Sequence, residues 1–156
     1  MLAQPAPYSA PPFLLADTEL LRSEELLRLA TEVAEVGLWD VDLLADTLFW
    51  SARVKAMFGI SPDVPVSMAD FHACPYPEHR AATTAAFAAA VDPLQRGGYD
   101  VEYRTVGKED GVIRWIAAKG RAQFDDNGRC IRVLGTVVDI TGPKKTEPSL
   151  KESETL

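Results

Sequence analysis

The sequence has few of the side chains from which metal sites and disulfides are built. Its 156 residues include two cysteines and two histidines. Cys74 and Cys130 stand far apart in the chain and match no metal-ligand spacing. We therefore expect no metal site, and two isolated thiols favour a reducing cytoplasm.

Basic residues and long apolar runs are scarce as well. Lys and Arg number 16 against 23 Asp and Glu, which gives a net charge of −7. This balance argues against nucleic-acid binding, because such proteins neutralise phosphates with basic side chains. No apolar run approaches the ~20 residues that span a bilayer, and the start of the chain has no basic segment of a secretory signal. We expect a cytoplasmic protein without membrane insertion, with recruitment to a cell site by a partner left open.

The composition suits one domain with a hydrophobic core. Hydrophobic residues make up 47% of the chain and charged residues 25%, which is ordinary for a globular protein. The pattern divides the chain into four segments: a disordered, proline-rich tail over 1–16, an amphipathic helix over 17–36, a domain over 37–141, and a flexible tail over 142–156.

The amphipathic helix has one apolar face. Asp17 or Thr18 is expected to cap its start. Leu26, Leu29 and Val33 then recur at helical spacing, while charged residues lie away from them. This face either covers the sheet of the domain or forms a dimer seam or a docking face for a partner.

The domain itself mixes short strands and helices. Alternating apolar residues predict strands, and glycine-containing turns separate the last three of them. Prolines between residues 61 and 77 prevent a long helix there. The order predicts an α+β fold, with an antiparallel sheet and helices grouped on one face. The expected strands are 38–43, 48–50, 99–106, 111–124 and 129–140, and the expected helices are 51–59 and 77–92.

Four motifs of the domain resemble the PAS family, in the subgroup whose last strands form the PAC region. "GLWDVDL" followed by "LFWSARVKAMFGIS" is similar to the family's opening strand pair and first helix, and "YPEHR" resembles the start of its long helix. Residues 99–141 are similar to its closing three-stranded meander. Asp139-Ile140-Thr141 resembles its exit motif. The resemblance covers roughly residues 33–141.

The resemblance implies a five-stranded sheet in the order 2-1-5-4-3 with helices cupping one face. Domains of this family sense ligands, cofactors or redox state, or they mediate protein association. Because one fold serves many functions, the site has to be argued from the residues.

The residues argue against the cofactors that some members of the family bind. The flavin adduct motif needs a cysteine in a helix, and the prolines Pro75 and Pro77 that follow Cys74 disrupt such a helix. The haem-binding relatives place a histidine inside the long helix, whereas His79 lies in its first turn and His72 lies in the preceding loop. We therefore expect neither flavin nor haem.

The interior of the long helix is nearly all alanine around Phe87. Either the helix lies close to the sheet, or space remains for a small apolar ligand. We favour a small or filled pocket, since several aromatic residues are available to occupy the volume. The expected lining is Trp39, Phe58, Ala85, Phe87, Ala89 and Trp115.

The sequence offers no catalytic constellation. Asp139 and Glu102 have no paired base, and we expect Glu102 to pair with Arg104 or Arg114 on neighbouring strands. No nucleophile motif or phosphate-binding loop is present. We therefore expect no enzymatic activity.

The residues after the exit motif indicate whether a helix leads from the domain to another part of the protein. Gly142 and Pro143 come next and are expected to break a continuing helix. If the chain is complete, it carries no output domain, and we then expect a stand-alone module that acts by protein–protein interaction on two-component histidine kinases, with a homodimer as an option. The alternatives are a ligand sensor that uses the cavity, or the excised sensor domain of a larger kinase. The expected interface consists of Leu26, Leu29, Val33, Ile113, Trp115 and Val133.

Overall fold

The computed structural model describes the backbone of residues 12–145 and the side chains of residues 16–145. Most of the predicted tail over 1–16, and residues 146–156 of the tail predicted over 142–156, lie outside the described residues. The chain forms two units, one that ends at Ala34 and one that begins at Glu35.

The first unit contains the helix α1 (Pro12–Ala34). It begins inside the segment predicted as a tail, so Asp17 and Thr18 are interior residues of the helix and not its cap. A proline is tolerated in a first turn because the amide there has no helical acceptor. The helix ends before Glu35, which adopts a left-handed conformation with φ of 55°. Over the described residues, no helix combines the length and the apolar character needed to cross a bilayer.

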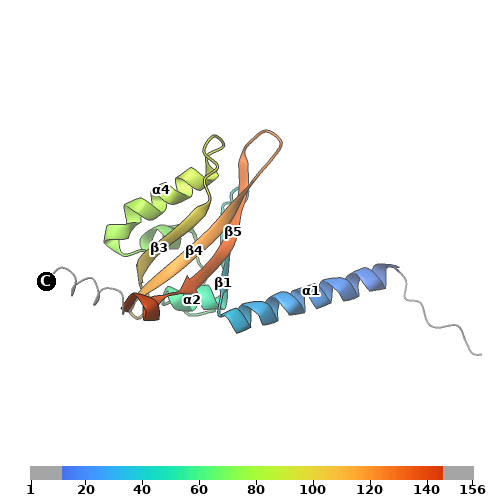
Figure 1. The fold of residues 1–156 in the computed structure, drawn as a ribbon, viewed down its shortest axis with the longest axis horizontal. Coiled ribbons are helices and arrows are strands. Elements are labelled where there is room, and N and C mark those ends of the chain that lie inside the picture. Colours follow the sequence, from blue (N-terminus) through green and yellow to red (C-terminus); the bar gives the residue numbers. More distant parts are fainter. Residues whose placement is uncertain (1–11, 146–156) are drawn as a thin grey trace, which may run out of the picture. The chain divides into compact units, whose positions relative to one another are not determined.

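The second unit is built on one antiparallel sheet (Figure 1). The strand order is β2-β1-β5-β4-β3, as the resemblance implied. Gly111 and Gly128, both at positive φ, occupy the turns between the last three strands, where a residue without a Cβ is favoured. The strands are β1 (Gly37–Asp42), β2 (Thr47–Trp50), β3 (Tyr99–Val106), β4 (Ile113–Phe124) and β5 (Cys130–Asp139).

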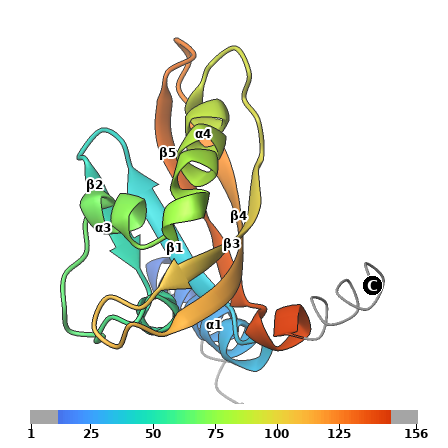
Figure 2. The same cartoon turned by 90° about the vertical axis from the view of Figure 1, so that its left-hand side faces the viewer.

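Helices cover one face of this sheet (Figure 2). Ser51 caps α2 (Ala52–Met57) by accepting a hydrogen bond from the Val54 amide, and Ser67 with Asp70 forms a capping box on α3 (Met68–Ala73). The predicted long helix consists of a 3₁₀ turn, η1 (Pro77–His79), followed by α4 (Arg80–Val91). The prolines therefore limit α3 to a short helix, as the sequence indicated.

The indole ring of Trp39 organises the inner face of the sheet. Trp39 lies opposite Gly135 in the β1–β5 pair, and Gly135 lies opposite Gly120 in the β4–β5 pair. A Cβ at Gly120 would overlap the indole ring, and one at Gly135 would overlap the backbone of Lys119. The ring can lie against the central strands only because residue 120 is glycine, whereas Gly135 leaves room for the adjacent backbone of β4. Its Nε1 donates to the carbonyl of Thr136 at 3.1 Å.

The segment after β5 differs from the expectation. Residues 141–145 form a helical turn directly after the strand, and the Lys144 amide donates to the Ile140 carbonyl at 3.0 Å. Pro143 does not prevent the turn, because it stands in the first turn, where a helix needs no amide hydrogen from it. The prediction that Gly142 and Pro143 break a continuing helix is wrong for residues 141–145, which are helical.

We predict that Gly120→Ala destabilises the second unit. The added methyl group has to displace the Trp39 ring, and overpacking of a core costs about 1–3 kcal/mol. Urea unfolding followed by tryptophan fluorescence measures the change.

Gly98→Ala is the matched control, because a Cβ there meets no atom within 4 Å. Its free energy of unfolding should stay within about 0.5 kcal/mol of the parent. Equal stability of the two variants would contradict the packing described for Trp39.

Candidate functional site

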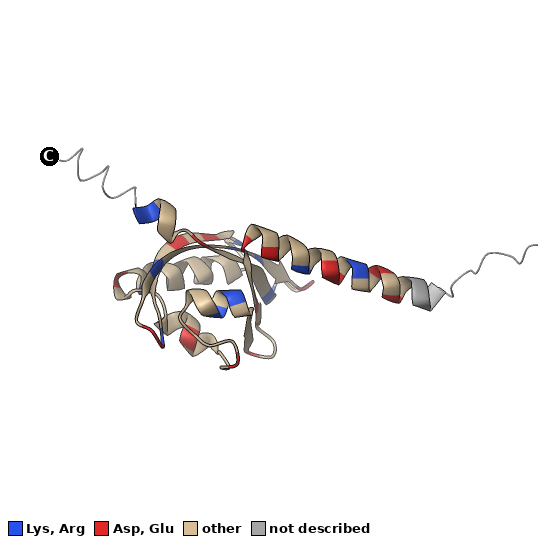
Figure 3. Ribbon diagram, turned by 90° about the horizontal axis from the view of Figure 1, so that it is seen from below, with Lys and Arg blue, Asp and Glu red and all other residues tan. Residues whose placement is uncertain are grey.

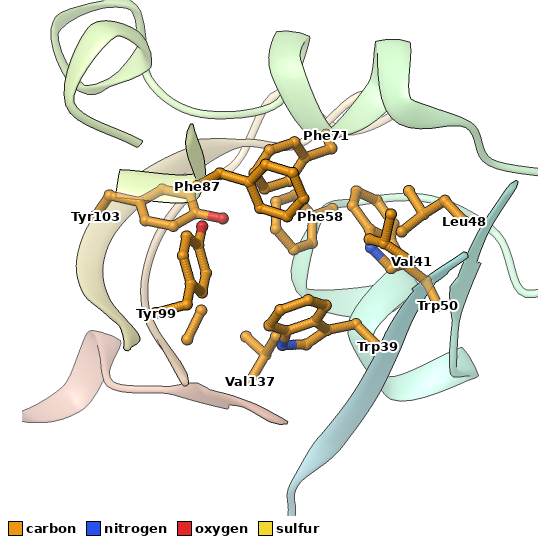
Figure 4. Close-up of a pocket in the computed structure, with 11 residues that line it drawn as sticks. Trp39, Val41, Leu48, Trp50, Phe58, Phe71, Phe87, Tyr99, Tyr103 and Val137 are labelled. Carbon is orange, nitrogen blue, oxygen red and sulfur yellow. The ribbon is translucent and has the colours of Figure 1, made fainter. Parts of the chain in front are cut away.

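A cavity lies between the inner face of the sheet and the covering helices (Figure 4). Its lining comes from the five strands of the sheet, from Phe58 directly after α2, and from the covering helices α3 and α4. The side chains are aromatic or aliphatic, and none carries a charge. They are Trp39, Val41, Leu48, Trp50, Phe58, Phe71, Phe87, Tyr99, Tyr103, Ala118 and Val137.

Aromatic pairs hold the lining in place. Trp50 stacks on Phe58 with ring centroids 4.4 Å apart, and the edge of Tyr99 meets Trp39 at 5.5 Å. Edge-to-face and stacked pairs are preferred because of the charge distribution of aromatic rings. The rings leave a space of only about 20 Å³, which is enough for about one water molecule. The pocket is thus small, in agreement with the interpretation favoured from the sequence.

The structure brings some of the residues that were expected in the lining together and leaves others outside it. Trp39, Phe58 and Phe87 line the cavity. Ala85 is exposed on the outer side of α4, and Ala89 does not reach the cavity. The two tyrosines of β3 were missed, although Tyr99 and Tyr103 are four residues apart on one strand and therefore share a face.

Trp115 was also expected in the lining, but it belongs to the opposite face of the sheet. Its neighbour Ile116 is fully buried, and successive residues of a strand alternate between faces. The Trp115 backbone binds the exit motif: its carbonyl accepts from the Ile140 amide at 2.9 Å, and its amide donates to the Thr141 hydroxyl at 3.0 Å. Lys144 lies over the indole ring at 5.0 Å. Trp115 therefore anchors the segment by which the chain leaves the sheet.

The carboxylates of this region pair differently from the prediction. Glu102 binds Lys144 at 3.1 Å. The two arginines expected for it are engaged elsewhere, Arg104 with Glu78 and Arg114 with Asp110. The pairing was wrong because the strand pattern contained no information about the turn that brings Lys144 over β4.

His79 joins the start of α4 to β3. Its Nδ1 accepts a hydrogen bond from the Arg104 amide at 2.9 Å, and its ring lies 5.5 Å from that of Trp115. Burial lowers the pKa of His79, the charge of Arg104 lowers it further, and Glu78 opposes the change. The neutral imidazole is therefore the form that this contact requires.

The thiols are poor nucleophiles. Burial raises the pKa of Cys74 to about 11, so the thiol stays protonated at neutral pH. Both cysteines are buried, as expected for Cys74. Over the part of the chain that the structure describes, no cluster of histidine, cysteine and carboxylate side chains has the arrangement of a metal site.

Most of the expected interface residues are exposed. Leu26, Leu29 and Val33 are exposed on α1, and Ile113 is exposed on β4. Val133 is an exception, since its side chain is fully buried on the inner face of the sheet. Val133 is therefore not available to a partner in this conformation, because the alternation of β5 places Val133 and Val137 inward.

Both signs of charge occur along α1 (Figure 3). Arg28 pairs with Glu25 at 2.5 Å and with Glu32 at 2.9 Å. Glu25, Arg28 and Glu32 lie to one side of the row formed by Leu26, Leu29 and Val33. Leu20, Leu21 and Leu27 are exposed on other sides of the helix, so the apolar residues of α1 are not confined to this row.

Comparisons with known proteins agree with this geometry. The family described as PAS fold matches residues 47–137. Sensor protein FixL of Bradyrhizobium diazoefficiens is 30% identical over 131 residues, which are 84% of this chain and 25% of FixL. A blue-light-activated histidine kinase of Brucella anthropi is 30% identical over 137 residues, 83% of this chain and 25% of the kinase. The chain thus spans about a quarter of the length of these relatives.

Solved structures show the same fold. A sensory box histidine kinase/response regulator from Burkholderia thailandensis is 30% identical and superposes with a TM-score of 0.72, over 83% of this chain and 95% of that one. A light-oxygen-voltage domain solved in a study of a flavin analogue is 19% identical, with a TM-score of 0.57, and covers 83% of this chain and 94% of that one.

These relatives overturn the expectation that the chain binds no cofactor and that flavin and haem can be set aside. A kinase named for activation by blue light matches most of the chain, and a light-oxygen-voltage domain shares its fold. The lack of one cysteine motif is therefore not sufficient to exclude a cofactor. The cavity as described does not accommodate a flavin or a haem, so the covering side chains would have to move to admit either group.

We predict that the stability of the chain falls as the pH drops below about 6.5, the usual pKa of histidine. The pKa of His79 is lowered in the folded state, so the unfolded chain takes up the proton first. The loss begins near pH 6.5 and continues down to the lowered pKa, whereas the stability gained from the neutral form is complete at higher pH. Thermal unfolding between pH 7.5 and 5.5 measures it.

His79→Asn keeps an acceptor near the Arg104 amide but does not titrate, so it should flatten this dependence. His72→Asn, which removes the exposed histidine of α3, is the control and should retain it. An unchanged pH profile for His79→Asn would contradict the role given to the neutral imidazole.

Proposed function

The chain belongs to the PAS fold family, and we propose on that basis that it is a signalling module that regulates histidine kinases through protein–protein contact. The named relatives support the signalling part, since one is a sensor protein and another is a histidine kinase. The match covers about a quarter of each relative, so we carry no kinase activity over and propose that the described domain has none of its own.

One observation carries the proposal that the module works by contact. The row of apolar residues Leu26, Leu29 and Val33 on α1 is exposed, with 67% of Leu26 and 85% of Val33 accessible to solvent. Several large apolar side chains on one helix are typical of a surface that packs against another helix. Leu26, Leu29 and Val33 recur at the spacing of one helical face. We propose that this surface receives a helix of a histidine kinase, and that a second copy of the chain competes for it.

A ligand-responsive sensor is the second candidate, and a different observation favours it. The cavity contains the hydroxyl groups of two buried tyrosines, Tyr99 and Tyr103, in an otherwise apolar lining. A polar group of this kind is unusual in a core whose only task is packing. In this alternative the state of the cavity sets the signal, and the α1 surface transmits it.

We predict that Leu26→Glu abolishes association with a kinase and leaves the fold intact. The carboxylate would have to be buried without a partner in the contact, which is strongly unfavourable. The measurement is capture of the full chain from cell extract at physiological salt, with histidine kinases identified in the bound fraction by mass spectrometry.

Leu21→Glu is the matched control. Leu21 is equally exposed, at 65%, but lies about 140° around the helix from Leu26. Capture should therefore survive Leu21→Glu and be lost with Leu26→Glu. Equal capture by both variants, or no histidine kinase in the parent fraction, would reject the proposed surface.

A further inference from the structure

The segment before α4 pairs with the edge strand β3. The Val106 amide donates to the Cys74 carbonyl at 3.0 Å, and the Tyr76 amide donates to the Arg104 carbonyl at 2.7 Å. The Arg104 amide on the same edge donates to Nδ1 of His79 at 2.9 Å. The imidazole of His79 therefore takes the place of the carbonyl that a neighbouring strand supplies to an edge amide.

This hydrogen bond exists only while the imidazole is neutral. A neutral imidazole has one acceptor nitrogen, whereas a protonated imidazole carries a hydrogen on both nitrogens and has none. If His79 takes up a proton, Nδ1–H and the Arg104 N–H point at each other as two donors. Protonation therefore breaks the link between the start of α4 and β3.

The indole ring of Trp115, next to His79 on the outer face of the sheet, already has two cations near it. Arg104 lies 5.6 Å and Lys144 lies 5.0 Å from the ring centroid. The His79 ring lies 5.5 Å from the same indole, so its protonation brings a third cation to one ring. An indole attracts each cation separately, but the cations repel one another.

The charges that face this cluster are paired before His79 takes up a proton. Glu78 of η1 pairs with Arg104 of β3, and Glu102 of β3 pairs with Lys144, both at 3.1 Å. Arg80, at the start of α4, donates to two backbone carbonyls of the preceding loop. The positive charge of a protonated His79 is thus added to two ion pairs that are already complete.

Lys144 is the cation that can leave the indole ring most easily. Arg104 belongs to a central part of β3 and also stacks on Tyr76 at 4.1 Å, so it cannot move without the strand. Lys144 belongs to the exit turn (residues 141–145), in which its amide donates to the Ile140 carbonyl. A short turn at the end of a sheet opens at a lower free energy than a paired strand.

We propose that His79 is a proton-sensitive switch between the start of α4 and the exit turn. In the neutral form it links α4 to β3 and leaves the Trp115 ring to Lys144. In the protonated form the link is broken, Lys144 leaves the ring, and the exit turn loosens. The proton is thus an input to the module that depends neither on the kinase contact nor on the cavity.

Nuclear magnetic resonance of the full chain labelled with ¹³C-lysine tests the switch, because the ring current of Trp115 displaces the ε-methylene signal of Lys144 from that of an exposed lysine. Lys144→Met assigns this signal, and the His79 ring signals are followed in the same samples. The titration runs from pH 7.5 to 5.0, above the usual pKa of carboxyl groups, about 4. Circular dichroism checks that the chain stays folded.

We expect the Lys144 signal to lose at least half of its displacement by pH 5.0. Its midpoint should coincide with that of His79 and lie below about 6.5, the usual pKa of histidine, because the pKa of His79 is lowered in the fold. In His79→Asn, which cannot take up the proton, the Lys144 signal should stay constant. His72→Asn on α3 is the matched control and should keep the full response.

Three results overturn the proposal. In the first, His79 titrates while the Lys144 signal stays constant. In the second, the folded chain reaches pH 5.0 without protonation of His79. In the third, the Lys144 signal moves equally in His79→Asn. The first two are read in the parent protein, so they decide the matter even if a variant fails to fold.

Discussion

The contact between the Trp39 indole ring and the glycine pair of the central strands is the constraint on which the rest of the unit depends. Gly120 and Gly135 face each other across β4 and β5, and neither position has room for a Cβ. The indole ring occupies the space that a side chain at position 120 would take, and the absence of a Cβ at Gly135 lets β5 lie close to the backbone of Lys119 and Gly120. The ring also forms one wall of the cavity. The edge of Tyr99 packs against this ring, so the same contact also positions the polar end of the cavity.

The cavity and the exit of the chain lie on opposite faces of the same two strands. On β3, Tyr103 points into the cavity while its neighbour Arg104 stacks on Tyr76 at 4.1 Å. On β4, Ala118 lines the cavity and Trp115 holds the exit motif. Because successive residues of a strand point to opposite faces, the residues that line the cavity and those that hold the exit motif are neighbours along the same backbone. His79 adds a second connection, since it links the start of the helix that covers the cavity to Arg104 and Trp115.

Much of this arrangement could be predicted from the sequence, because local patterns determine it. The glycine turns and the alternation of apolar residues predicted the meander, and the resemblance to the PAS family implied the order of the strands in the sheet. The features that were missed depend on distant contacts. Val133 was assigned to a partner surface, although the pairing with β1 turns it inward. Glu102 was given arginine partners, although the turn over 141–145 supplies Lys144. Trp115 was placed in the cavity because its type suits a core, whereas its position in the strand decides its face.

The exclusion of cofactors relied on single motifs, and the relatives show that this is too narrow a test.

The measurement that tests the account most directly is the autophosphorylation rate of a histidine kinase, captured with the chain, as purified chain is added. Action through protein contact predicts a rate that changes with the amount of added chain and reaches a plateau as the contact saturates. The direction of the change will tell whether the module activates or inhibits. A rate that stays constant at a concentration where the chain is bound would contradict the account, because the contact would then carry no signal.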